Sequence, residues 1–169
     1  MPRRSRSPIP THILFIDIDG VLNRCDWEEG DPRAALYRSC VRQLNRVLAS
    51  TNAGLVIASN WRERIEDGAM TLQGFEFLLR THGVVGGRVV GVTAPDDDVT
   101  GRGAQVATWL ARHPQVQAFA ILDDESEWPE PPSQRRRLVH VDGKNGLTPA
   151  AAGRAIRLLR TPLRNRHVR

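Results

Sequence analysis

The amino-acid sequence predicts an α/β protein built on a mainly parallel, doubly wound sheet. Apolar runs that are short enough for strands and have no polar face alternate with stretches of helical periodicity. Strands of that kind are buried on both faces, as in a parallel sheet covered by helices. Three of the runs end in polar side chains, and ligands bind at the carboxyl ends of strands in such sheets. With their polar ends, these runs are residues 13–19, 55–60 and 118–124.

The first apolar run leads from Ile13 to two carboxylates, Asp17 and Asp19, and then to Gly20. Side chains two residues apart point to the same side of an extended chain, so we expect both carboxylates to face one side. Gly20 allows a sharp exit from the strand. Two carboxylates at the mouth of a buried strand are costly unless a cation holds them. The pattern therefore favours a divalent metal site in which Asp17 also serves as a nucleophile.

The chain that follows continues the alternation of helices and strands. Over residues 35–49 apolar side chains recur every three or four positions, which predicts a helix with one buried face. The second apolar run predicts a strand over 55–60. A helix is expected over 72–81, with Gly83 as its C-terminal stop. The Gly/Val-rich stretch 84–93 has room for one short strand.

In the second half of the chain, Pro and Thr residues mark the ends of helices. Pro114 ends one helical pattern, because proline cannot continue a helix. Thr148 followed by Pro149 is typical of an N-cap and the first helical position. The expected elements are, in order, a loop (94–103), a helix (104–112), the strand 118–124, a loop (125–134), a strand (138–142) and a helix that runs to about residue 160.

Length and composition indicate one domain. The 169 residues are enough for a sizeable core, and we place the domain at 12–160, between a disordered basic tail (1–11) and a basic C-terminal tail (161–169). No apolar stretch approaches the length that spans a membrane, and no signal-peptide pattern is present. Cys25 and Cys40 have no metal-type spacing. Reduced thiols and a soluble, cytoplasmic protein are therefore expected.

The charge balance is basic, with a formal net charge of +5 and an isoelectric point of about 10.4. A polyanionic partner such as nucleic acid would suit that balance. Lys144 is the only lysine, so nearly all of the positive charge is arginine. A GC-rich genome alone could produce such an arginine bias. Both explanations stay open at this stage.

The motifs follow the order found in the haloacid dehalogenase (HAD) superfamily. The run Asp17-Ile18-Asp19-Gly20-Val21-Leu22-Asn23 resembles the first motif of that superfamily. Ser59 follows a hydrophobic strand as in the second motif, Arg102 stands before a helix as in the third, and Asp123-Asp124 closes a strand as in the fourth. The resemblance covers most of residues 12–160. It implies a Rossmann-like core and a phosphatase.

The resemblance also implies roles for the acidic residues. Asp17 would attack phosphorus and form an aspartyl-phosphate. Asp19 would protonate the leaving oxygen and then deprotonate the attacking water, with its backbone carbonyl facing the metal. Mg²⁺ suits an all-oxygen site made of Asp17, Asp19 and Asp123, with Asp124 supporting it through water.

Polar and basic residues would hold the phosphate of the substrate. Ser59 and Asn60, with nearby backbone amides, would bind phosphate oxygens. Arg102 would balance charge on the phosphate and on Asp17. Arg62 or Lys144 could take the place of Arg102 as the basic residue of the third motif.

Within the superfamily, the sequence is most similar to the small HAD domain of Swiss Army knife RNA-repair proteins. The similar segments include Ser59-Asn60-Trp61-Arg62, Trp109-Leu110 and the late Asp142…Gly146-Leu147-Thr148. That resemblance implies removal of a terminal phosphate from RNA or DNA, or from a nucleotide. The connections are too short for a large cap, so a minimal cap or none is expected. An open site of this kind can admit the end of a polymer.

Three other functions stay open. The first is a HAD phosphatase for small metabolites. The second is a phospho-acceptor domain, which also uses an acidic cluster. The third is a nucleic-acid-binding module without turnover. The sequence does not distinguish 3′ from 5′ phosphate or RNA from DNA, and it does not reveal the oligomeric state.

Overall fold

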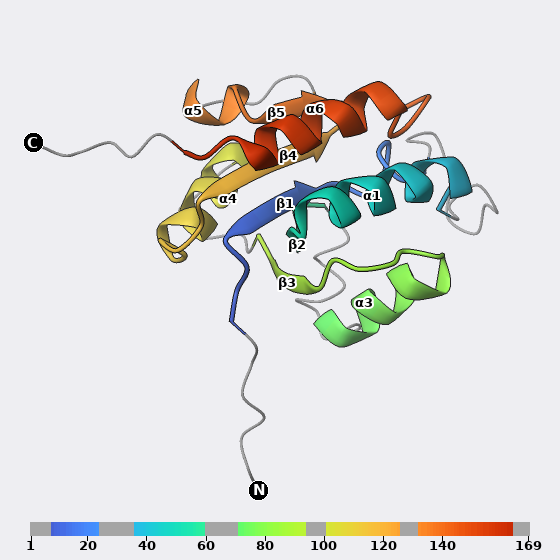
Figure 1. Cartoon of the computed structure of the whole chain (residues 1–169), viewed down its shortest axis with the longest axis horizontal. Coiled ribbons are helices and arrows are strands. Elements are labelled where there is room, and N and C mark those ends of the chain that lie inside the picture. The colour runs from blue at the N-terminus through green and yellow to red at the C-terminus, as the bar shows by residue number, and fades with distance from the viewer. Residues whose placement is uncertain (1–7, 24–35, 60–70, 94–100, 126–131, 164–169) are drawn as a thin grey trace, which may run out of the picture.

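The computed structural model describes five segments of the chain, which together contain a five-stranded parallel sheet with helices on both faces (Figure 1). The described segments are residues 8–23, 36–59, 71–93, 101–125 and 132–163. The strands are β1 (His12–Ile16), β2 (Gly54–Ile57), β3 (Val89–Val92), β4 (Ala118–Asp123) and β5 (Leu138–His140). The helices are α1 (Arg38–Thr51), α3 (Leu72–Thr81), α4 (Arg102–Ala111), α5 (Pro132–Arg135) and α6 (Pro149–Arg160). The predicted Rossmann-like α/β fold is confirmed.

The strand order is β3-β2-β1-β4-β5, and every neighbouring pair is parallel. β1 is therefore central, with β2 on one side and β4 on the other. The connections turn in opposite directions on the two sides of β1, which makes the β1–β4 edge the switch point where ligands bind in such sheets. Ile16 pairs with Leu122, so the next residues, Asp17 and Asp123, leave the sheet side by side.

The two faces of β1 pack into two hydrophobic clusters. Leu14 and Ile16 belong to a cluster with buried residues of α1, α3 and α6. Ile13 and Phe15 point to the other face and join a cluster with α4, where the ring of Phe15 meets Trp109 edge to face at 5.4 Å. Figure 1 shows α1 and α6 side by side on the first face. Because β1 is covered on both faces, it needs the unbroken apolar run seen in the sequence.

The predicted helix ends at residues 83 and 148 are confirmed. Gly83 follows α3 with φ +90°, a conformation that favours glycine. Thr148 caps α6, because its Oγ1 accepts a hydrogen bond from the backbone N–H of Ala151 at 3.2 Å, and Pro149 is the first helical residue. These two helix ends could be predicted from the sequence because they depend only on neighbouring residues.

Several predicted boundaries are wrong. The helix expected over 35–49 is α1, Arg38–Thr51, and the helix expected over 104–112 is α4, Arg102–Ala111. The strand expected over 55–60 is β2, Gly54–Ile57, and the strand expected over 138–142 is β5, Leu138–His140. The loop expected over 125–134 overlaps the short helix α5.

A tertiary contact accounts for α5. Gln134 lies in this helix and is 3% exposed, and its Nε2 donates a hydrogen bond to the carbonyl of Gly103 at 2.7 Å. Composition suggested a loop because it reports local preference and not this buried contact.

Contacts of the described residues extend past both predicted domain boundaries. The Arg88 side chain donates to the carbonyl of Pro8 at 2.7 Å, before the predicted start at residue 12. The backbone N–H of Leu163 donates to the carbonyl of Gln117 at 2.7 Å, beyond the predicted end at residue 160. The remaining tail residues lie outside the described part of the chain. Within that part, no helix is both long enough and apolar enough to cross a membrane.

A tight turn takes the chain away from β1. The backbone N–H of Leu22 donates to the carbonyl of Ile18 at 2.8 Å, and Gly20 has φ +74°. A β-carbon on Gly20 would overlap the carboxylate of Asp124. Gly20 is thus required both by its backbone conformation and by the close approach of Asp124.

Replacing Gly20 by alanine tests this double requirement. Gly20→Ala is expected to lower the free energy of unfolding by about 3 kcal/mol, because the left-handed conformation costs about 1–2 kcal/mol and Asp124 must also move. Gly86→Ala is the matched control, since Gly86 has φ +78° but no described atom would lie within 4 Å of its β-carbon. Urea unfolding should show a loss of about 1 kcal/mol for the control. Equal losses in the two variants would contradict the close approach.

Candidate active site

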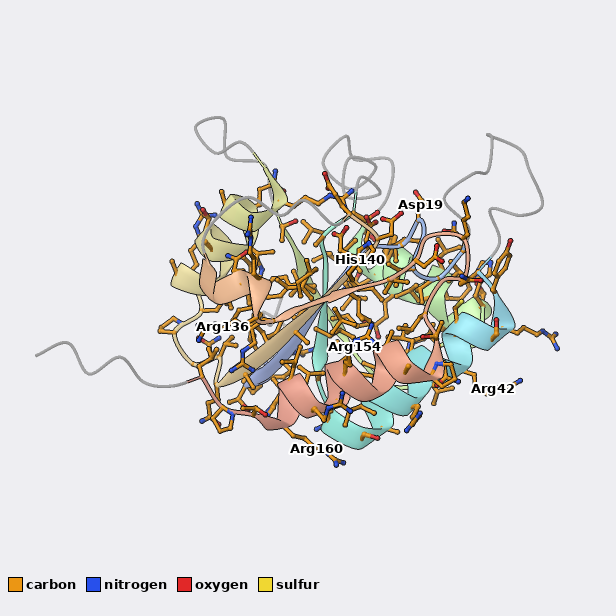
Figure 2. The ribbon with its side chains drawn as sticks, turned by 90° about the horizontal axis from the view of Figure 1, so that it is seen from above. Asp19, Arg42, Arg136, His140, Arg154 and Arg160 are labelled. Carbon is orange, nitrogen blue, oxygen red and sulfur yellow. The ribbon has the colours of Figure 1, made fainter. Side chains whose placement is uncertain are left out.

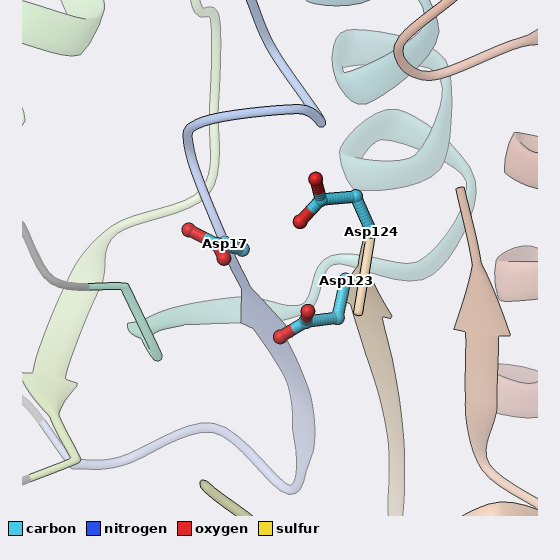
Figure 3. A group of neighbouring side chains, drawn as sticks. All are labelled: Asp17, Asp123 and Asp124. Atoms are coloured by element: carbon cyan, nitrogen blue, oxygen red, sulfur yellow. The ribbon is translucent and has the colours of Figure 1, made fainter. Parts of the chain in front are cut away.

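Three carboxylates gather at the carboxyl ends of β1 and β4. One oxygen each from Asp17, Asp123 and Asp124 lies within 4.8 Å of the others (Figure 3). Asp17 is 3% exposed and Asp123 is fully buried. The parallel register of β1 and β4 brings these residues together from positions far apart in the sequence.

Backbone hydrogen bonds fix two of these carboxylates. Asp17 Oδ1 accepts from the N–H of Ile18 at 2.6 Å. Asp123 Oδ1 accepts from the N–H of Glu125 at 2.8 Å. Each carboxylate therefore keeps its second oxygen directed toward the neighbouring side chains of the site.

A single guanidinium joins the same two carboxylates. Nη1 of Arg102 donates to Asp17 Oδ2 and to Asp123 Oδ2, the latter at 2.7 Å. Nε of Arg102 lies 3.6 Å from Glu125 Oε2. Burial alone would lower the pKa of Arg102, but the charges of Asp17 and Asp123 and the hydrogen bonds to both raise it above its ordinary value. Arg102 therefore stays cationic beside Asp17 and Asp123.

The cluster carries more negative than positive charge. Burial raises the pKa of Asp123 to about 6, although the Arg102 charge opposes that rise. Burial and the charge of Asp17 also raise the pKa of Asp124. Against three ionised carboxylates, Arg102 leaves two negative charges uncompensated. A divalent cation would remove this repulsion, and hard carboxylate oxygens are the ligands that Mg²⁺ prefers.

Asp19 lies apart from this cluster. It is absent from the group of carboxylates within 4.8 Å of one another among the described residues. Its Oδ1 accepts a hydrogen bond from Nδ2 of Asn23 at 2.8 Å, and Asn23 Oδ1 accepts from the N–H of Gly20 at 3.2 Å. Through Asn23, the side chain of Asp19 is thus held to the turn. Its predicted role as a metal ligand stays a prediction.

Two residues of the site had no role in the sequence prediction. Asn23 is fully buried and orients Asp19, and Glu125 lies beside Arg102. The signal for Asn23 was present, because a buried amide four residues after a carboxylate in a tight turn is placed to hold it. Glu125 carried no comparable signal in the sequence.

Of the two polar residues that were predicted to bind phosphate, Ser59 and Asn60, the structure describes only Ser59. Ser59 is 1% exposed and follows β2, whose continuation is held to β1 by the Ala58 N–H, which donates to the carbonyl of Ile16 at 2.9 Å. Ser59 therefore lies at the same sheet edge as Asp17. Asn60 lies outside the described residues.

Arg102 is the basic residue that contacts the acidic cluster in the described part of the chain. Arg62, one alternative, falls outside that part. Lys144, the other, is exposed in the turn after β5, where its backbone N–H donates to Asp142 Oδ1 at 3.0 Å.

The fold and the acidic cluster define a Rossmann-like domain of the HAD class. The chain belongs to the family described as the HAD domain in Swiss Army Knife RNA repair proteins, whose family model matches residues 13–152. The match includes all three carboxylates of the cluster as well as Arg102, and it suggests phosphatase activity. No curated protein matches the chain closely enough to count as a relative.

The raised pKa of Asp123 predicts a pH-dependent stability of the metal-free protein. The protonated carboxyl is favoured by folding, so its stabilising effect is present near pH 4 and lost as the pH rises through about 6. The free energy of unfolding in EDTA is expected to fall by about 2–3 kcal/mol from this group. Asp123→Asn cannot titrate, so the stability of this variant minus that of the wild type should increase from pH 5 to pH 8. Chemical denaturation at four pH values would measure it, and a constant difference would contradict the prediction.

Removing the guanidinium should destabilise the metal-free protein. Arg102→Gln leaves Asp17 and Asp123 buried beside each other without a cation, which is expected to cost about 3 kcal/mol at pH 8. Arg136→Gln, an exposed arginine that follows α5, serves as control and should change stability by about 0.5 kcal/mol or less. Thermal or urea unfolding in EDTA compares the two. Similar small losses in both would show that the ion pairs do not hold the site together.

Proposed function

We propose that this domain is a Mg²⁺-dependent phosphomonoesterase that works through an aspartyl-phosphate on Asp17. Its substrate is proposed to be a terminal phosphate of RNA or DNA, or of a nucleotide. The observation that supports this most is the position of Asp17 between Arg102 and two further carboxylates at the switch point of the sheet. A buried nucleophile beside a fixed cation and a cluster with excess negative charge suits attack on an anionic phosphate.

In the first step, a carboxylate oxygen of Asp17 attacks phosphorus. A bond forms between that oxygen and phosphorus, and the bond from phosphorus to the ester oxygen breaks. Asp19 gives a proton to the leaving oxygen, which departs as an alcohol. The hydrogen bond from Ile18 N–H to Asp17 Oδ1 orients the nucleophile, and Arg102 is placed to hold a phosphate oxygen.

In the second step, water releases the phosphate. Asp19, now ionised, takes a proton from the water, whose oxygen bonds to phosphorus while the bond to Asp17 breaks. Inorganic phosphate leaves, and both aspartates return to their initial protonation states. Asn23 holds Asp19 in position through both proton transfers. Ser59 is proposed to bind phosphate oxygens during the reaction.

Asp17 and Asp123 are proposed to hold the metal, with Asp124 beside them and the backbone carbonyl of Asp19 as a further oxygen. The donor set fits Mg²⁺, because the three carboxylates are close together and supply only oxygen. When bound, Mg²⁺ reduces the repulsion between the anionic nucleophile and the anionic phosphate.

Two observations support a nucleic-acid end as substrate. The matched family is described by RNA repair, and the chain carries a net charge of +5. A HAD phosphatase for small metabolites and a phosphate-accepting or nucleic-acid-binding module without turnover are the alternatives. Turnover on different phosphates separates these alternatives.

A phosphatase panel with Mg²⁺ tests the proposal. The substrates are p-nitrophenyl phosphate, mononucleotides, a sugar phosphate, and oligonucleotides with a 3′ or a 5′ phosphate. Asp17→Asn is expected to reduce kcat at least 10³-fold, because the covalent step is lost, whereas Asp142→Asn, an exposed aspartate outside the cluster, should retain activity. Activity on oligonucleotides should fall with added salt more steeply than activity on p-nitrophenyl phosphate.

Each part of the proposal has its own contradicting outcome. Full turnover by Asp17→Asn would overturn the covalent mechanism. Turnover confined to the sugar phosphate would remove the nucleic-acid substrate and leave the phosphatase. No turnover on any phosphate in the presence of Mg²⁺ would favour a module without catalysis.

A further inference from the structure

A cationic hollow lies on the surface between α1 and the end of α3. Its volume is about 510 Å³. The side chains that carry charge or polarity in it come from both helices and the residue that follows α3, and none of the described residues that line it is acidic. The lining includes Arg38, Arg42 and Asn45 of α1, Thr81 of α3, and His82.

The walls of this hollow are fixed to each other. Asn45 Nδ2 donates to the carbonyl of Gly83 at 2.8 Å. Asn45 Oδ1 accepts from the N–H of Val85, also at 2.8 Å. The Asn45 side chain thus attaches α1 to the segment after α3 through two hydrogen bonds, one as donor and one as acceptor. The hollow is formed before any ligand arrives, which lowers the cost of binding.

Three arginines run along the exposed side of α1. Arg38, Arg42 and Arg46 are spaced four residues apart, so they form a row on the helix surface about 12 Å long, which we call the α1 stripe. α1 contains no acidic residue, and its N-cap, Tyr37, makes no side-chain cap hydrogen bond. Like charges at this spacing destabilise a helix, and a cation in the first turn opposes the helix dipole. The stripe therefore weakens α1.

The arginines of the neighbouring helix α6 differ, because folding gives them partners. Arg154 donates to the carbonyl of His140 at 3.3 Å, and Arg160 donates to the carbonyl of Ser50 at 3.1 Å. Arg157 and Arg160 also lie in the last turn of α6, where cations favour the helix dipole. No such benefit is seen for the α1 stripe in the described residues. A ligand that pairs with guanidinium groups would account for three arginines on a helix that they weaken.

We propose that the α1 stripe and the adjoining hollow bind the sugar–phosphate backbone of a single-stranded nucleic acid. Guanidinium groups pair with phosphate oxygens through two parallel hydrogen bonds. The stripe begins beside the candidate active site, because the N–H of Tyr37 donates to the carbonyl of Leu22 at 2.8 Å, and Leu22 belongs to the turn that carries Asp19. Figure 2 shows Arg42 toward the end of α1 nearer to Asp19.

The path of the bound nucleic acid rests on the proposed function. If its terminal phosphate lies at Asp17, the next nucleotides lie along α1. An anionic membrane is less suited to this surface. The exposed positions of α1 are arginine, serine and alanine, so the helix itself offers no large exposed apolar side chain. Of the large exposed apolar side chains among the described residues, Phe77 belongs to α3, and Val85 is a single such side chain beside the hollow. Membrane-binding helices pair cations with apolar side chains that insert.

Binding without turnover tests the surface separately from the catalytic proposal. The probe is a fluorescein-labelled 20-nucleotide RNA without a terminal phosphate, titrated in EDTA at several KCl concentrations and followed by anisotropy. R38Q/R42Q/R46Q is expected to lower affinity at least tenfold at 50 mM KCl. It should also reduce the slope of log K against log salt by about 2, which corresponds to three phosphate contacts on a single strand. R38K/R42K/R46K keeps the charge but loses the paired hydrogen bonds of the guanidinium groups, so it should keep the salt slope of the wild type and lose less affinity than R38Q/R42Q/R46Q.

The control removes the same charge elsewhere. R112Q/R135Q/R136Q neutralises three exposed arginines outside α1, α3 and α6 and should change affinity by less than threefold. Circular dichroism and the thermal midpoint confirm that each variant is folded. Equal losses in stripe and control variants would overturn the proposal, as would a wild-type protein that does not bind the RNA at 50 mM KCl. Binding to phosphatidylserine vesicles but not to RNA would overturn it as well.

Discussion

The site depends on one partly buried guanidinium placed between two buried carboxylates. Arg102 bonds to Asp17 and Asp123, which leave β1 and β4 at paired positions of the parallel sheet. Without a cation, two carboxylates could not be buried this closely at neutral pH. The same pair cannot be fully neutralised, because Asp124 adds a third carboxylate. The remaining negative charge, which destabilises the cluster by repulsion between carboxylates, also suits a divalent cation.

The rest of the fold places Arg102 and the three carboxylates where ligands can reach them. β1 is central and covered by α1 and α6 on one face and by α4 on the other, so its carboxyl end is the part that ligands can reach. α4 begins with Arg102 itself, and Gly101, with φ +97°, allows the chain to enter the helix at that position. Gly20 turns the chain away so that Asp124 can approach. The hydrophobic core therefore fixes the geometry, while short turns at one edge carry the polar chemistry.

Much of this could be predicted from the sequence, because the strongest signals are local. Unbroken apolar runs predicted the central strands, and the polar residues at their ends predicted Asp17, Ser59 and Asp123 as site residues. What could not be read depends on contacts between distant segments. The short helix α5, for example, depends on a hydrogen bond from Gln134 to Gly103, which no local pattern reports. The reason at Asp19 is local instead: the strand ends at Ile16, so the rule for extended chains, which predicted that Asp19 faces the same side as Asp17, no longer applies after it.

We propose that the ends of β1 and β4 form one magnesium site. Isothermal titration calorimetry of Mg²⁺ into the purified protein tests it most directly, with Asp123→Ala compared with Asp142→Ala, which removes an exposed carboxylate outside the cluster. We expect one Mg²⁺ per chain in the wild type and in Asp142→Ala, and at least tenfold weaker binding in Asp123→Ala. Unchanged Mg²⁺ affinity in Asp123→Ala would show that the ends of β1 and β4 do not form the magnesium site.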